Sequence, residues 1–324
     1  MTSSPAVSAT GASSGETETP KVGIGMPVYN GAELIGLAIE SILAQTFTDF
    51  ELVIVDNAST DDTVAIARHY AERDPRVTVH INESNIGAAP NFDRAFELTR
   101  GPYFKWAAHD DLMEPEFIER CVRVLDEDDG VVLAYPKAMI IDEVGADVEP
   151  YDLHLPTDSD DVVERFASLL RGHKCFEVFG LIRRDPLATT PGMGAYSHGD
   201  GVLLARLALL GRFVEVPRYD FRARRHAKQS MAMLGDYHQY AVWFDPRLKD
   251  KWVFPQWKIH WEFFKSIWRS RIGGRERRHC YKALAGWAWK RRRLLRGDVT
   301  YHIRRVLQKW TGWTLPGRAT KKDS

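Results

Sequence analysis

Cysteine, net charge and long apolar runs are all scarce in this sequence of 324 residues. The three cysteines, Cys121, Cys175 and Cys280, lie too far apart for a C-x-x-C zinc site or a disulfide framework. No apolar run approaches the roughly 20 residues that a membrane-spanning helix needs. The amino terminus also lacks the basic start and apolar block of a signal peptide. We therefore expect a protein of the reducing cytoplasm, without a spanning helix.

The formal net charge of +0 hides an asymmetry along the chain. Acidic residues outnumber basic ones up to about Phe244, whereas basic residues predominate from Arg247 onward. Two such parts should meet different partners, and the basic part should meet something anionic.

The basic part also carries an aromatic stripe, whose members follow helical spacing: Trp257, Trp261, Phe264 and Trp268. Aromatic residues in this pattern usually pack on the parent domain, which is our default for Trp257 and Trp261. Tryptophan beside Lys and Arg is also typical of a helix in the headgroup region of an anionic membrane. Nucleic acid ranks last and we expect none, because no RNA-binding signature accompanies the basic block.

Apolar runs of strand length alternate with helical patterns from residue 22 onward. The expected strands are 22–26, 52–55, 77–81 and 103–107, and the expected helices are 32–44, 61–71, 91–98 and 115–125. This alternation predicts βαβ units and a mostly parallel sheet, the α/β class. Beyond Val131 we expect mixed α+β structure, with helices over 162–170 and 201–210 and two short strands in "RFVEVPRYDFRARRH".

Three segments follow from these patterns. Residues 1–20 have no apolar periodicity and are expected to be a disordered tail. Residues 21–245 should form one domain, with a nucleotide-binding half over 21–135 and an acceptor half over 136–245. Residues 246–324 should form a basic, Trp-rich helical extension.

The first strand opens "KVGIGMPVYNG", which lacks the G-x-G-x-x-G spacing of a dinucleotide-binding loop, because Val28 occupies the third glycine position. In a parallel sheet, ligands bind beyond the carboxyl ends of the strands, so the residues just after each strand are the candidates. They are Pro27, Val28, Tyr29 and Asn30; Asp56 and Asn57; Asn85 and Gly87; and His109, Asp110 and Asp111. Adjacent carboxylates such as Asp110 and Asp111 can hold a hard divalent cation, or can cap the following helix.

Together these pieces resemble the nucleotide-sugar domain of family 2 glycosyltransferases, which has the GT-A fold. The resemblance spans about residues 21–230 and rests on "MPVYNG", "AIESILAQTFTDFELVIVDNASTDDT", "NIGAAPNFDRAFELTRGPYFKWAAHDDLMEP" and "SHGD". It implies that Pro27, Tyr29 and Asp56 cradle the base of the nucleotide. It also implies that Asp110 and Asp111 hold the ribose and a metal ion, Mg²⁺ or Mn²⁺.

The resemblance extends to the acceptor half. It implies that Asp200 is the general base, and that His226, with Arg224 and Arg225, belongs to a segment that closes over the diphosphate and adds a metal ligand. Two positions depart from the family pattern: Ala108 stands where the first Asp of D-x-D-D is expected, and Gly199 stands before Asp200 where Glu is common. An Asp at a helix start is often only a cap, so the structural interpretation of Asp200 stays open.

The favoured hypothesis is an inverting, metal-dependent glycosyltransferase with a UDP-type nucleotide-diphosphate-sugar donor and a saccharide or lipid-linked acceptor. Its C-terminal helices would hold it at the inner face of the cell membrane, and a homo-oligomer is left open. A non-catalytic GT-A module that binds nucleotide-sugar or glycan and recruits a partner is the alternative, favoured by Ala108. A sugar-nucleotidyltransferase is more remote, because "MPVYNG" offers no glycine-rich, basic loop for a triphosphate.

Overall fold

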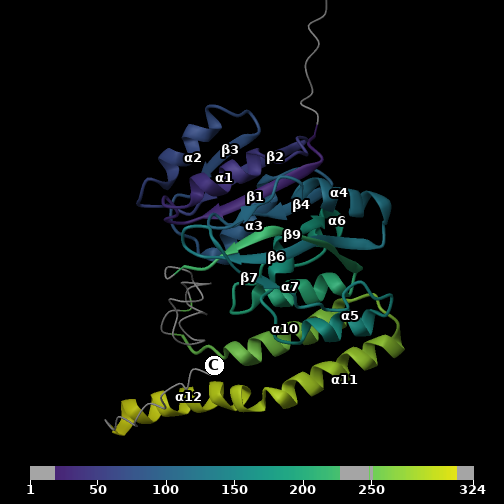
Figure 1. Cartoon of the computed structure of the whole chain (residues 1–324). Helices are drawn as coiled ribbons and strands as arrows, with labels where there is room; N and C mark the ends of the chain where they lie inside the picture. The colour runs from purple at the N-terminus through teal and green to yellow at the C-terminus, as the bar shows by residue number, and fades with distance from the viewer. Residues whose placement is uncertain (1–18, 227–247, 249–250, 312–324) are drawn as a thin grey trace, which may run out of the picture.

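The computed structural model describes residues 19–226, residue 248 and residues 251–311 (Figure 1). For residues 304–311 it describes the backbone alone. Most of the tail predicted over 1–20 and the predicted boundary at residues 245 and 246 lie outside the described residues. In the first half, four strands alternate with helices as expected. The strands are β1 (Val22–Val28), β2 (Phe50–Asp56), β3 (Val77–Ile81) and β4 (Tyr103–Trp106), and the helices are α1 (Ile35–Leu43), α2 (Thr63–Ala71), α3 (Ala88–Leu98) and α4 (Phe117–Glu127).

The second half adds antiparallel pairs to the same sheet. Its elements are β5 (Leu112–Met113), β6 (Val131–Ile141), β7 (Asp147–Tyr151), α5 (Val162–Leu169), the 3₁₀ helix η1 (Phe176–Phe179), β8 (Leu181–Arg183), α6 (Arg184–Ala188), α7 (Gly199–Ala208) and β9 (Arg212–Arg224). The strands run in the order β3-β2-β1-β4-β8-β6-β9-β5, and β7 pairs with β6. One mixed sheet therefore joins both halves.

The parallel ladder sets the edge where the candidate residues meet. Strand β1 pairs with β2 from Val22 opposite Phe50 to Val28 opposite Asp56, and it pairs with β4 on its other side. Both faces of β1 are buried, so its side chains form a continuous apolar run without a polar face. The carboxyl ends of these parallel strands consequently lie at one edge.

The prediction of two short strands in residues 212–226 is wrong, because β9 is a single strand of 13 residues. It runs parallel to β6, and the register shifts after Pro136 pairs with Val216, so that Ala138 next pairs with Phe221. Both Pro136 and Pro217 lie at this irregularity. A bulge is where a strand tolerates proline without losing the ladder, so the apparent break in the sequence is a bulge in the structure.

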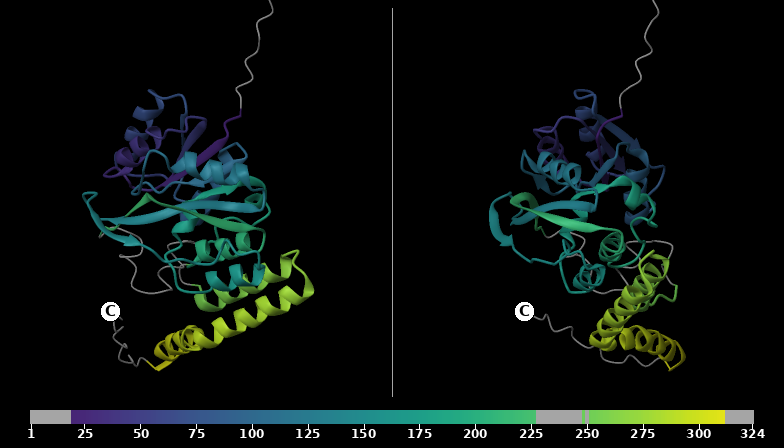
Figure 2. Two further views of the ribbon diagram at one scale, coloured as in Figure 1. Left: turned by 45° about the vertical axis from the view of Figure 1, so that its right-hand side comes forward. Right: turned by 90° about the vertical axis from the view of Figure 1, so that its right-hand side faces the viewer.

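Three C-terminal helices form a further layer below the sheet domain (Figures 1 and 2). They are α10 (Pro255–Arg269), α11 (Gly274–Lys290) and α12 (Arg292–Thr311). Helix α10 packs on α7 through Phe263 and Ile267, which are fully buried in the same core cluster as α7. A buried ion pair also joins these two helices, with 2.6 Å between Arg206 Nη2 and Glu262 Oε2. Helix α11 adds Cys280, Leu284 and Trp287 to the same cluster, so the first two C-terminal helices are anchored in the core of the domain.

The default that Trp257 and Trp261 pack on the parent domain is wrong for their side chains. Helix α10 buries its opposite face, and the side chains of Trp257, Trp261 and Trp268 stay 46%, 50% and 63% exposed. Trp257 contacts α12, where its Nε1 donates a hydrogen bond to the Leu295 carbonyl. Phe264, the remaining member of the stripe, is partly buried against the core and lies near Tyr281 of α11. The tryptophan side chains of the stripe therefore face outward, and Phe264 does not. No helix in the described part of the chain has the length and apolarity to cross a membrane.

Candidate functional site

Asp56 ends β2 at the carboxyl edge of the sheet and has no exposed surface. Its Oδ2 accepts a hydrogen bond from the Ser59 backbone N–H at 2.9 Å, whereas its Oδ1 is buried and has no hydrogen-bond partner among the described residues. Leaving a buried acceptor unsatisfied costs about 1–3 kcal/mol, so such atoms call for an explanation. A ligand N–H or O–H that reaches Oδ1 would satisfy it.

Tyr29 directly follows β1, whose last residue, Val28, pairs with Asp56 at the end of β2. Asn30 adopts a left-handed φ of 52°, and its Oδ1 accepts a hydrogen bond from the Thr60 backbone N–H at 2.8 Å. The next residue must be glycine, because a Cβ on Gly31 would lie 2.5 Å from the His109 ring. The side chains of Pro27 and Val28 are buried, and Tyr29 is 46% exposed. Of these three side chains, only the Tyr29 ring is open to a ligand.

Asn85 and Gly87 brace the neighbouring loop. The Oδ1 of Asn85 accepts hydrogen bonds from Asn57 Nδ2 at 3.0 Å and from the Gly87 backbone N–H at 2.9 Å. Gly87 has a φ of 92° and precedes the first turn of α3. These contacts fix the shape of the loop that lies next to Asp56.

Asp110 and Asp111 follow β4 and meet the end of β9. Asp110 Oδ2 lies 3.0 Å from His226 Nε2, and the Asp111 Oδ1 accepts a hydrogen bond from the Arg224 backbone N–H at 2.8 Å. Burial, and then the neighbouring charge of Asp110, raise the pKa of Asp111 well above its usual range. The structure thus brings His226 to Asp110, whereas the Asp111 carboxylate turns to the backbone of β9. Among the described residues, the ligand atoms of Asp110, Asp111 and His226 do not all lie within 4.8 Å of one another.

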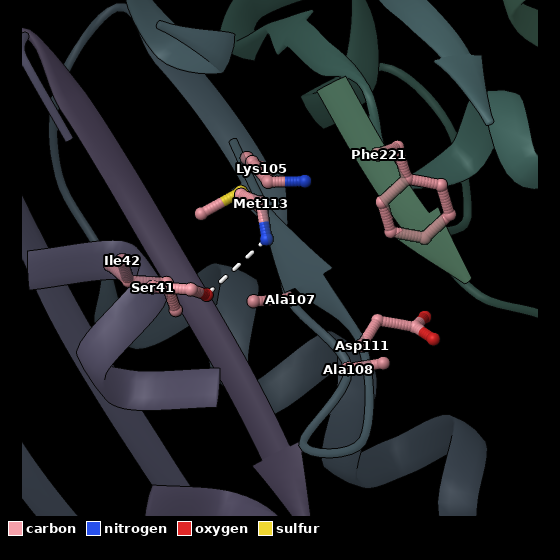
Figure 3. Close-up of a pocket in the computed structure, with 8 residues that line it drawn as sticks. All are labelled: Ser41, Ile42, Lys105, Ala107, Ala108, Asp111, Met113 and Phe221. Atoms are coloured by element: carbon pink, nitrogen blue, oxygen red, sulfur yellow. Dashed lines mark hydrogen bonds between the residues drawn. The ribbon is translucent and has the colours of Figure 1, made fainter. Parts of the chain in front are cut away.

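The donor set fits a divalent cation. Mn²⁺ accepts both carboxylate and imidazole ligands, whereas Mg²⁺ prefers the carboxylate oxygens. A cation beside Asp111 would offset the burial that raises the pKa of this carboxyl. Next to Asp111 lies a cavity of about 10 Å³, near the size of one water molecule (Figure 3). Ala108 contributes its methyl group to the lining of that cavity.

Sequence reasoning missed Lys105, which lies in β4 with its side chain buried. Its Nζ donates a hydrogen bond to the Phe179 carbonyl and lies 4.2 Å from the centre of the Phe117 ring. Burial lowers the pKa of Lys105 to about 7, and the charge of Asp111 acts against that shift. The signal available in the sequence was a lysine inside the apolar run "YFKW".

Asp200 occupies the first turn of α7, and its Oδ1 accepts a hydrogen bond from the Gly201 backbone N–H at 2.7 Å. Within residues 19–226, no hydrogen bond or ion pair joins Asp200 to Asp110 or Asp111. Helix η1 connects the two groups, because its Phe179 carbonyl holds Lys105 while its Glu177 faces the Asp200 side. The candidate site residues therefore form two groups, one with Asp110 and Asp111 and the other with Asp200, and η1 contacts residues of both.

The model of the family described as Glycosyl transferase family 2 matches residues 24–185, half of the chain. The chain belongs to glycosyl transferase family 2. The match covers the parallel half, the carboxylate pair and β8, and the GT-A fold expected from the resemblance is confirmed.

Among curated relatives, an uncharacterized glycosyltransferase of Rickettsia typhi is 34% identical over 128 residues, which are 39% of this chain and 39% of the relative. Chondroitin synthase of Escherichia coli is 36% identical over 126 residues, 39% of this chain and 18% of the synthase. The chain therefore spans well under half the length of these relatives.

Solved structures of similar fold cover more of the chain. Residues 1–349 of Staphylococcus aureus TarS in complex with UDP give a TM-score of 0.60 at 16% identity, over 84% of this chain and 71% of that one. The mannosyltransferase of Pyrobaculum calidifontis in complex with GDP-Man and Mn²⁺ gives 0.51 at 20% identity, over 91% and 84%. At these identities the similarity shows the fold alone.

Proposed function

We propose that this family 2 member is an inverting glycosyltransferase that uses a nucleotide-diphosphate-sugar. The observation that carries the proposal is the buried Oδ1 of Asp56, which no described residue contacts by a hydrogen bond, at the sheet edge that also holds the exposed Tyr29 ring. A base that stacks on Tyr29 could donate an N–H to that oxygen. The imide N–H of uracil suits this acceptor, and UDP is bound in the TarS structure, so we favour a UDP-type donor.

Asp110, Asp111 and His226 would hold Mg²⁺ or Mn²⁺ beside the diphosphate. When bound, the cation neutralises negative charge on the diphosphate leaving group. The carboxylates of the pair would also orient the ribose, and the charge of Asp111 acts on the buried Lys105 amine.

Asp200 is the proposed general base. An acceptor hydroxyl has a pKa far above neutral, so a carboxylate must take its proton as the oxygen attacks the anomeric carbon. Asp200 has the exposure that this role needs, since its side chain is 39% exposed at the start of α7. Attack from the face opposite the nucleotide inverts the anomeric configuration.

The exposed stripe on α10 favours a membrane surface as the place of action. Trp261, Lys265, Trp268 and Arg269 line a hollow of about 300 Å³. Exposed tryptophan beside basic side chains is the pattern of a helix lying at an anionic headgroup layer. We propose that this face holds the protein at the inner face of the cell membrane, near a lipid-linked or growing saccharide.

Replacement of Asp56 tests the donor site. Asp56→Asn should lower the affinity for UDP roughly 10- to 100-fold, because the amide can keep the Ser59 bond only by presenting an N–H to the base. Thermal shift and calorimetric titration with UDP and Mn²⁺ measure the change. Asp62→Asn, an exposed carboxylate at the start of α2 with no side-chain cap bond, is the matched control. Equal UDP affinity in Asp56→Asn and Asp62→Asn would remove Asp56 from the donor site.

Replacement of the two most exposed tryptophans of the stripe, Trp261 and Trp268, tests the membrane proposal. Trp261→Ala with Trp268→Ala should reduce sedimentation with phosphatidylserine-containing vesicles at least about fivefold, since two exposed rings leave the interface. Truncation before α10 is unsuitable, because Phe263 and Ile267 belong to the core. Val144→Ala, an exposed apolar change on the turn between β6 and β7, is the control. Unchanged sedimentation of the double variant would contradict this proposal.

A further inference from the structure

Asp200 belongs to a compact group of metal-ligand side chains. Cys175 Sγ, a ring nitrogen of His198 and a carboxylate oxygen of Asp200 all lie within 4.8 Å of one another. His173 adjoins them, with its Nε2 3.5 Å from Cys175 Sγ. These residues come from two segments, one just before η1 and the other at the start of α7.

A buried acceptor also faces this group. Glu177 Oε2 lies 3.9 Å from His173 Nε2, at side-chain exposures of 4% and 0%, and it accepts no hydrogen bond from the described part of the chain. The other ring nitrogen of His173, Nδ1, lies 3.0 Å from the Arg171 carbonyl. In metal sites, an N–H donated to such a carbonyl orients the ring and leaves the lone pair of the second nitrogen for the metal. Here that nitrogen is Nε2, which faces Cys175 and Glu177.

A glycine lies against the His198 ring. Gly201 leaves room for the His198 ring, because a Cβ there would lie 2.2 Å from its Cε1.

We propose that Cys175, His198 and Asp200, with His173 as the fourth ligand, bind a divalent cation of the zinc class. A thiolate with imidazoles selects Zn²⁺ over Mg²⁺ or Ca²⁺, and a structural or inhibitory zinc ion is tetrahedral. Tetrahedral ligands at roughly 2.0–2.3 Å from zinc stand about 3.5 Å apart. Cys175 Sγ and His173 Nε2 already have this spacing, and the other ligand atoms, which lie within 4.8 Å of one another, need to approach by at most roughly 1 Å. This donor set differs from the oxygen-rich set of Asp110 and Asp111.

Zinc in this group would inhibit sugar transfer, and this consequence rests on the proposed function. As a general base, Asp200 takes the proton of the acceptor hydroxyl with a carboxylate lone pair. It would need the same lone pair to bind the metal ion. Zinc and acceptor should therefore compete for Asp200, while Mn²⁺ beside Asp110 is unaffected.

Titration of the full chain with Co²⁺, read by absorption, tests the site without any glycosyl transfer. The wild type should bind one Zn²⁺-displaceable Co²⁺ with the near-ultraviolet charge-transfer band of a cobalt–thiolate bond. Cys175→Ser should lose that band and bind at least about tenfold more weakly. Cys280→Ser, which changes another buried thiol, should keep it. Absence of the band from the wild type, or its persistence in Cys175→Ser, would overturn the proposal.

A second variant guards against a folding defect in Cys175→Ser. His198 has a φ of 63°, a conformation that asparagine tolerates, so His198→Asn removes the imidazole with little backbone strain. It should keep the near-ultraviolet band but lose Co²⁺ affinity at least about tenfold; unchanged affinity would refute the role of His198. In assays with Mn²⁺ in excess, Zn²⁺ should inhibit transfer by the wild type and not by Cys175→Ser. Inhibition of both alike would refute the competition, whereas a failure of transfer with every donor would leave the cobalt result standing.

Discussion

Replacing Asp200 by asparagine is expected to lower the turnover of sugar transfer by roughly 10²- to 10⁴-fold, the contribution typical of a general base. Asparagine keeps the size of the side chain and an oxygen for the Gly201 N–H, so the start of α7 should stay intact. Donor binding should not change, because Asp200 makes no described contact with Asp110 or Asp111. The rate of UDP release in the presence of acceptor and the affinity for UDP with Mn²⁺ measure the two effects separately.

Asp161→Asn is the control that separates a base from a helix cap. Asp161 stands at the start of α5, where its Oδ1 accepts a hydrogen bond from the Val163 backbone N–H at 2.8 Å. Asparagine caps helices about as well as aspartate and keeps an oxygen for the Val163 N–H, so this substitution should leave both thermal stability and turnover nearly unchanged. If Asp200→Asn behaves in the same way, Asp200 is a cap and the assignment of the base fails.

Converting Asp110 and Asp111 together to asparagine should abolish the Mn²⁺-dependent part of UDP binding and lower kcat/KM at least about 100-fold. Neutral amides bind a hard divalent cation far more weakly than carboxylates do, and the diphosphate then loses its countercharge. The amide oxygen introduced at position 111 can still accept from the Arg224 backbone N–H, which preserves the contact with β9. Thermal shift with UDP, in the presence and absence of Mn²⁺, reports the loss, because a ligand that binds only the native state raises its apparent stability.

An exposed pair of carboxylates in the acceptor half provides the control for this double change. Asp158→Asn with Asp160→Asn removes the same charge from the surface before α5 and should leave the Mn²⁺ response intact. A full Mn²⁺-dependent shift in the variant of Asp110 and Asp111 would show that the pair does not hold the cation. The non-catalytic alternative, by contrast, predicts the loss of the Mn²⁺ shift but no turnover in the wild type.

The parallel half was predictable because its strands obey one simple rule. Residues 22–28 and 50–56 are buried on both faces, so they appear in sequence as continuous apolar runs between amphipathic helices. The ends of the helices moved by a few residues; α4, for example, begins at Phe117 rather than Pro115. In β6 and β9 local signals failed, since Pro136 and Pro217 interrupt the ladder without ending either strand.

The candidate site also has a part that the sequence pattern predicts and a part that only packing determines. Asp56, Asp110 and Asp111 could be found because each follows a strand, and the topology of a parallel sheet brings such residues to one edge. Lys105, His173 and Glu177 could not be found in this way, since their meeting depends on how η1 packs between the two groups. The outward direction of the α10 stripe was equally hidden, because the sequence contains two apolar faces and only packing against α7 decides between them.

A crystal structure of the full chain with UDP and Mn²⁺ is the most direct test of the donor site. It should place the uracil against the Tyr29 ring with an N–H on Asp56 Oδ1, and the metal between the diphosphate and Asp110. A nucleotide that binds elsewhere and leaves Asp56 Oδ1 without a partner would contradict the account.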